Sequence, residues 1–153
     1  MKISNDTRNV LKNFSTINSG IRVKSGNKLE TISNMKNILA VATIDESFPQ
    51  DFSIYNLPEF LGATSLMSDP DFQFGDASLT VADDSSSLAY FYASEGMVVA
   101  PDKMITMPEA EINIEISSAL LSELQKAASV LGVNDLVLSS DGNTIKLEVT
   151  DKK

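Results

Sequence analysis

Three stretches of this chain repeat one pattern: an amphipathic helical segment, a strand, a turn that contains glycine, and a second strand. The helical segments begin near Val10, Leu57 and Leu120. The turns are Ser25–Asn27, Gly75–Asp76 and Asp141–Asn143. A repeated unit implies that equivalents stack on one another, so the pattern predicts an α+β protein made of related half-domains. Chance similarity between three divergent copies is the alternative.

The composition favours a folded acidic protein and excludes several kinds of chemistry. Of the 153 residues, 42% are hydrophobic, which is enough for a real core, and the formal net charge is −9. Such a surface is not expected to attract phosphate or anionic membranes unspecifically. The absence of cysteine and histidine removes disulfides, thiolate chemistry, the usual zinc sites and imidazole bases. Because no run approaches the roughly 18 apolar residues of a membrane span, and Met1–Ser4 lacks the apolar core of a signal peptide, we expect a soluble intracellular protein.

The first copy carries clear helix signals. Ser4, Asn5 and Asp6 are possible N-caps, and Asn18–Gly20 ends the helix. The residues that share its apolar face at helical spacing are Val10, Leu11, Phe14 and Ile17. The later run Ile38–Ile44 is short, continuously apolar and partly β-branched, which predicts a buried strand.

The second copy is bounded by two predicted strands, Phe52–Tyr55 and Leu88–Tyr92. Between them, Asn56 is a predicted N-cap, with Pro58 in the first helical turn and Glu59 at the capping-box position.

The third copy begins with an alternating pattern. Ile112, Ile114 and Ile116 alternate with polar residues, which predicts a strand with one buried face. Ser117 or Ser118 is the expected cap of the next helix, and Gly132 stands where a C′ glycine belongs. The apolar stripe of this helix, which we expect to pack on a sheet, is Leu120, Leu121, Leu124 and Leu131.

The stretch from Gly96 to Pro108 has prolines and methionines but no clean period, which favours an extended connector between two domains. Its methionines either fill gaps against a sheet or form an adaptable surface for partner peptides, and both interpretations can hold. The residues that would form such a groove are Val98, Val99, Pro101, Met104, Ile105 and Met107.

No catalytic constellation is evident. The carboxylate pairs Asp69 with Asp71 and Asp83 with Asp84 lack the glycine and terminal glutamate of a calcium loop, so solvated turns are favoured over a metal site. There is no glycine-rich phosphate loop and no nucleophile elbow. We therefore expect a protein that is not an enzyme and needs no cofactor.

Six short blocks follow one another along the chain: Leu11–Phe14, Ile17–Ile21, Lys24–Gly26, Ile54–Leu57, Phe60–Gly62 and Val98–Lys103. In their order and approximate spacing, these blocks resemble the sliding clamp of T4-type bacteriophages. The blocks are spread from the N-terminus to the connector, about two thirds of the chain, and from Ile112 onward the match is mainly one of pattern.

The resemblance implies a DNA clamp fold of repeated βαβββ half-domains, with helices on one side and antiparallel sheets on the other. Its members are trimeric rings that encircle double-stranded DNA as processivity factors for the phage polymerase, with a clamp loader as a further partner. The implied domains are residues 1–96, a connector at 97–109, and the first half of a second domain at 110–153. The implied DNA-facing residues are Arg8, Lys12 and Lys126, and the implied location is the cytoplasm of the infected host.

The resemblance leaves two questions open. The chain stops after half of the second domain, so it is a fragment, a truncated open reading frame or a reduced variant. Because the half-domain after Ala110 expects a matching half, two copies of the chain are expected to pair there as a homodimer in place of the trimer. The alternative function is a β-rich phage or bacterial interaction or structural module with no DNA role.

Overall fold

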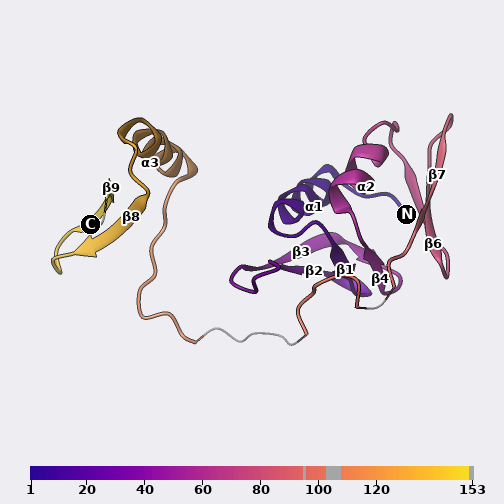
Figure 1. Cartoon of the computed structure of the whole chain (residues 1–153), viewed down its shortest axis with the longest axis horizontal. Coiled ribbons are helices and arrows are strands. Elements are labelled where there is room, and N and C mark those ends of the chain that lie inside the picture. The colour runs from indigo at the N-terminus through magenta and orange to yellow at the C-terminus, as the bar shows by residue number, and fades with distance from the viewer. Residues whose placement is uncertain (95, 103–107, 152–153) are drawn as a thin grey trace. The chain divides into compact units, whose positions relative to one another are not determined.

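The computed structural model describes residues 1–94, 96–102 and 108–151. The chain is a mixed α+β protein with small antiparallel sheets, and it divides into two compact units, Met1–Ile105 and Thr106–Lys153 (Figure 1). Each unit is described by itself below.

The first half of the N-terminal unit is a helix packed on a two-stranded sheet. Its elements are α1 (Asn5–Ile17), β1 (Ile21–Val23), β2 (Gly26–Ile32) and β3 (Leu39–Phe48). The Ser4 side chain accepts a hydrogen bond from the backbone N–H of Thr7, which confirms the predicted N-cap. Leu11 and Phe14 are buried, and α1 contacts both β2 and β3.

The second half has the order strand, helix and three strands. Its elements are β4 (Phe52–Ile54), α2 (Leu57–Thr64), β5 (Asp71–Phe74), β6 (Ser78–Ala82) and β7 (Ser87–Phe91). The Asn56 side-chain oxygen accepts a hydrogen bond from the backbone N–H of Glu59, which confirms the predicted N-cap. Glu59 accepts in return from the side-chain amide of Asn56, whereas the Asn56 backbone N–H donates to the Tyr90 hydroxyl, so the reciprocal bond differs from that of a regular capping box. Phe60 of α2 stacks edge-on with Phe72 of β5 and Tyr90 of β7, which holds α2 over the sheet of its own half.

The two halves are joined by reciprocal strand pairing. β1 of the first half pairs antiparallel with β4 of the second, and Val23 lies opposite Phe52. Met1, which precedes α1, exchanges two backbone hydrogen bonds of 2.8 Å with Phe72 of β5. In each case the segment before one helix pairs with the first strand after the other helix. The helices α1 and α2 lie side by side (Figure 1) and contact each other.

One core serves both halves. Its buried apolar members run from Ile3 to Val81, and an aromatic cluster crosses the junction. The rings of this cluster, with neighbouring centroids 5.4–5.9 Å apart, are Phe48, Phe52, Phe74 and Tyr92. These packed rings add to the apolar burial that stabilises this unit.

The expected burial of Ile38–Ile44 is wrong. Residues 39–44 do lie in a strand, β3, but Ile38 is 50% exposed and Val41 is 56% exposed, whereas Ile44 is buried. β3 has one strand neighbour among the described residues, β2, and α1 covers one of its faces. The apolar side chains on the other face are therefore open to solvent.

The described part of the C-terminal unit is a helix and a hairpin, and none of its described residues is buried. Its elements are α3 (Ser118–Leu131), β8 (Asp135–Ser140) and β9 (Ile145–Thr150). The predicted caps are confirmed: Ser117 accepts from the N–H of Leu120, and Gly132 ends the helix with a left-handed φ of 67°. The predicted hairpin is also confirmed, since β8 and β9 pair antiparallel across Asp141–Thr144.

Two expectations for this unit are wrong. Residues 112–116 form no strand, because a strand needs a hydrogen-bonded neighbour and none lies beside them in the described parts of the chain. The stripe of α3 is not buried: Leu120, Leu121 and Leu131 are 43%, 38% and 66% exposed. α3 contacts the small hairpin, which is too narrow to cover the whole stripe.

Candidate DNA-facing and partner-binding surfaces

The polar face of α1 carries the two basic residues that the sequence singled out. Lys12 is exposed, and at 100° per residue it points away from the face that buries Leu11 and Phe14. Arg8 is half-buried, and its Nε donates to the backbone carbonyl of Ile3, 3.4 Å away. This contact fixes Arg8 near the start of the helix, whereas Lys12 extends into solvent.

The third expected DNA-facing residue, Lys126, belongs to the C-terminal unit. It is an exposed residue of α3, as is Glu123. The structure therefore brings Arg8 and Lys12 onto one helix face and leaves Lys126 on a separate unit.

The beginning of the connector is anchored to the N-terminal unit by Asn18. This side chain is 5% exposed, and its amide donates to the carbonyls of Ile32 at 2.8 Å and Val99 at 2.9 Å. Its oxygen accepts from the N–H of Gly20. All three hydrogen bonds of this buried side-chain amide are to backbone groups. Asn18 therefore fixes both the turn after α1 and the path of the connector.

Arg22 and Gly20 complete the anchor. The Arg22 guanidinium donates to the carbonyl of Pro101 at 2.8 Å and lies 4.0 Å from the carboxylate of Asp102. Gly20 leaves room for Val98: a Cβ at Gly20 would lie 3.1 Å from the Val98 methyl group and 3.2 Å from the carbonyl oxygen of Tyr55.

Two open hollows flank the connector, and both include Arg22 and Lys24. The first is otherwise lined by Ser25, Gly26, Asn27, Lys28, Glu30, Ala100 and Pro101. The second is otherwise lined by Asp51, Phe52, Ser53, Tyr92, Ala93, Gly96 and Val98. The second hollow thus combines apolar groups with two cations, a lining that can receive an apolar side chain next to a carboxylate.

Only three of the six predicted groove residues lie in the described part of the chain. Val98 lines the second hollow and Pro101 the first, while Val99 is 39% exposed beside them. Met104, Ile105 and Met107 lie outside the described residues. Sequence reasoning missed Asn18, Arg22 and Lys24; the only available signal was a polar side chain next to a glycine turn, which is common at helix ends.

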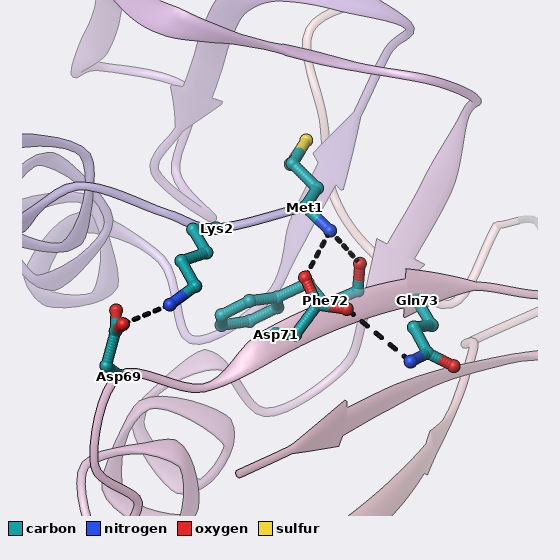
Figure 2. Close-up of polar contacts among 6 residues, drawn as sticks. All are labelled: Met1, Lys2, Asp69, Asp71, Phe72 and Gln73. Carbon is teal, nitrogen blue, oxygen red and sulfur yellow. Dashed lines mark hydrogen bonds and ion pairs between the residues drawn. The ribbon is translucent and has the colours of Figure 1, made fainter.

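Three of the four carboxylates considered for a cation, those of Asp69, Asp71 and Asp83, have protein partners. Asp69 pairs with Lys2, and Asp71 accepts from the N-terminal ammonium (Figure 2). Asp83 accepts backbone N–H bonds from Ser68, Ser85 and Ser86, which lower the pKa of its carboxyl to about 2. Within the described ranges, no three acidic residues gather in a way that could hold a metal ion.

None of the helices in the described part of the chain has the length and apolar character needed to cross a membrane.

Comparison with known proteins identifies the relatives of the chain. A family model described as DNA polymerase processivity factor matches residues 4–100. The sliding clamp of Vibrio phage KVP40 is 31% identical over 99% of this chain and 71% of its own length. The sliding clamp of Enterobacteria phage T4 is 36% identical over 91% of this chain and 62% of its own length. The sliding clamp of Escherichia phage RB69 is 32% identical, and the chain spans 65% of it.

Proposed function

The chain belongs to the family of DNA polymerase processivity factors, a non-catalytic family, and from this premise we propose that it acts as a sliding clamp on double-stranded DNA. In this role it tethers the replicative polymerase of a phage in the cytoplasm of the infected bacterium, after loading by a clamp loader. The chain spans 62–71% of the length of the relatives named above. The proposed domains are 1–96 and the half-domain 110–153, with residues 97–109 between them.

The observation that carries the proposal is the family match over residues 4–100, which includes α1, α2 and the sheets of both N-terminal halves. The net charge of −9 is compatible with it. An open DNA-binding surface gains affinity from each neutralised phosphate, whereas a ring holds DNA by its topology and needs only a mildly basic inner surface. Arg8 and Lys12 on α1 would supply that surface in the first domain, and Lys126 on α3 in the second.

The partner-binding part of the proposal concerns the connector. The hollow lined by Phe52, Tyr92 and Val98 next to Arg22 and Lys24 would receive a short apolar peptide that ends in a carboxylate, such as the C-terminal tail of a polymerase. The anchoring of residues 98–102 by Asn18 and Arg22 supports a groove that exists before the peptide arrives.

The direct test is primer extension on a circular template with the polymerase and clamp loader of the same phage. We expect the chain to lengthen the products of single binding events, and Lys12→Glu to shorten them again. Lys36→Glu is the matched control, because Lys36 is also exposed but lies in the turn between β2 and β3. Product lengths that do not change when the chain is added would reject the clamp function and support the alternative interaction module.

A further inference from the structure

The first of the two hollows beside the connector is basic, and we call it the basic hollow. Three of the twelve lysine and arginine residues of the chain line it: Arg22, Lys24 and Lys28. Glu30 supplies the single carboxylate of the same lining. Positive charge is therefore in excess here, on a chain whose formal net charge is −9. A basic site on an acidic surface attracts anionic groups to that one place.

The alternation of side chains along β1 and β2 places the basic hollow on the side that faces away from α1. Ile21, Val23 and Leu29 belong to the core on which α1 packs (Figure 1). Successive side chains of a strand point to opposite faces, so Arg22 and Lys28 project from the other side. The two strands therefore lie between the basic hollow and the helix that is proposed to face DNA.

Two of the three cations in the basic hollow can receive a carboxylate from outside. Lys24 and Lys28 are exposed, and neither takes part in an ion pair within the described ranges. The third cation shows the ligand chemistry of the site, because the Arg22 guanidinium lies 4.0 Å from the carboxylate of Asp102. Asp102 is itself largely exposed. One carboxylate thus meets the edge of the hollow, while the two ammonium groups have no such partner in the described chain.

The turn that carries these lysines is open above its backbone and held in shape. Gly26 lines the basic hollow with a φ of 110°, and a Cβ on it would meet nothing within 4 Å. An extended peptide can therefore approach the backbone between the two lysines. The preceding residue is fixed, since the N–H of Ser25 donates to the carboxylate of Asp51 at 2.7 Å. A turn that already has its shape loses little conformational freedom when a ligand binds.

We propose that the basic hollow binds a short acidic segment of a partner protein, whose aspartate or glutamate side chains pair with Lys24 and Lys28. Duplex DNA fits less well, because it carries one negative charge about every 1.7 Å and needs an extended basic surface. A short peptide meets the grouped cations without lying along the acidic surface of the chain. The inference goes beyond the proposed function, since Lys28 and Gly26 do not line the hollow assigned to the polymerase tail.

Titration of the isotope-labelled full chain with an acidic peptide, followed by amide NMR signals, tests the site. The probe is a short, acetylated and amidated peptide of alternating aspartate and glutamate. The control peptide has asparagine and glutamine in their place. At low salt, the signals of residues 24–28 should move with the acidic peptide and stay in place with the neutral one. Signals that do not move with the acidic peptide, or that move equally with both peptides, would overturn the proposal.

Charge reversal at Lys28 tests which cation holds the peptide. Lys28→Glu should raise the dissociation constant of the acidic peptide at least about tenfold, because repulsion replaces attraction at the contact. Lys28→Gln removes the charge alone and should have a smaller effect in the same direction. Lys36→Glu is the matched control, since Lys36 is also exposed but does not line the basic hollow. Equal weakening by Lys28→Glu and Lys36→Glu would show that the peptide responds only to net charge, and would contradict the site.

Two further titrations separate an acidic peptide from other anions. Inorganic phosphate, at concentrations at which the peptide saturates its signals, should leave residues 24–28 unchanged. Double-stranded DNA should also leave them unchanged, even where it moves the signals of α1. Phosphate that reproduces the shifts would reduce the basic hollow to an adventitious ion site only. DNA that displaces the peptide from residues 24–28 would assign the hollow to nucleic acid, and either result would overturn the proposal.

Discussion

The N-terminal ammonium of Met1 lies 2.6 Å from the carboxylate of Asp71. The same nitrogen donates to the carbonyl of Phe72 (Figure 2), whose N–H returns a bond to the Met1 carbonyl. The first residue of the chain is thus a member of the second half-domain's sheet. The hydrogen bond from the ammonium lowers the pKa of Asp71 below its ordinary value.

We expect the charged chain start to contribute to stability. A peptide tag left on Met1 replaces the charged ammonium by a peptide bond and places extra residues beside β5. Asp71→Asn removes the charge of the carboxylate instead. Each change should lower Tm by a few degrees in differential scanning calorimetry, whereas Asp76→Asn, at the exposed turn after β5, should not. Equal Tm values for tagged and untagged protein would contradict this role of the terminus.

A second carboxylate ties α1 to the sheet and predicts acid sensitivity. Burial alone would raise the pKa of Glu46, but hydrogen bonds from the Thr7 hydroxyl and the Ser4 N–H lower it to about 2, against an ordinary value of 4.5. Because the folded pKa is the lower one, this stabilisation is present above about pH 4.5 and is lost as the pH falls toward 2.

Glu46→Gln should therefore lower Tm at pH 6 and have a much smaller effect near pH 2. Glu30→Gln on the neighbouring strand β2 makes the same charge change and serves as the control. Thermal unfolding of both variants between pH 2 and pH 6 measures the difference. If Glu46→Gln cost the same at both ends of this range, Glu46 would not be the group whose protonation weakens the fold.

The parts of the fold that depend on neighbours in sequence were predictable. Ser4, Asn56 and Gly132 cap or end helices where the local pattern placed them, because capping needs only groups a few residues apart. Residues 112–116 alternate correctly yet form no strand, since strand formation requires a neighbour that local sequence cannot supply. Local sequence also predicted the apolar stripe of α3, but it could not show that most of this stripe is exposed to solvent.

The candidate site likewise has one part that local sequence predicts and another part that depends on residues far apart in the chain. Helical periodicity was sufficient to place Lys12 on the polar face of α1. The roles of Asn18 and Arg22 were not predictable, because their bonds to Val99 and Pro101 join residues about eighty positions apart. Only the folded chain brings these residues together.

The proposed peptide groove predicts a charge effect and an apolar effect. Lys24→Glu and Val99→Glu should each weaken binding of a polymerase C-terminal peptide by about tenfold or more. Lys36→Glu and Leu66→Glu are matched controls, because both positions are exposed, line neither hollow and lie outside the connector segment that contains Val99. Fluorescence anisotropy of the labelled peptide measures both, and binding that survives Val99→Glu unchanged would place the peptide elsewhere.

Gly20 and Gly62 predict opposite effects of the same substitution. A Cβ at Gly20 would lie 3.1 Å from Val98 and 3.2–3.3 Å from the carbonyl oxygens of Tyr55 and Ile54, so Gly20→Ala must displace the connector or β4. Overpacking of this kind costs about 1–3 kcal/mol. Gly62 lies within α2 and a Cβ there meets nothing within 4 Å, so Gly62→Ala should stabilise the chain by about 0.5–1 kcal/mol.

Urea unfolding of the two alanine variants measures these changes in the free energy of unfolding. Gly20→Ala should also loosen the connector, because the atom nearest to the new methyl group is a side-chain carbon of Val98, whereas the other two close atoms are backbone oxygens. Limited proteolysis should therefore cleave the Gly20→Ala protein faster between residues 96 and 110 than the Gly62→Ala protein. If Gly20→Ala unfolded at the wild-type urea concentration and resisted protease equally, the close packing of Val98 on Gly20 would not be what holds the connector in place.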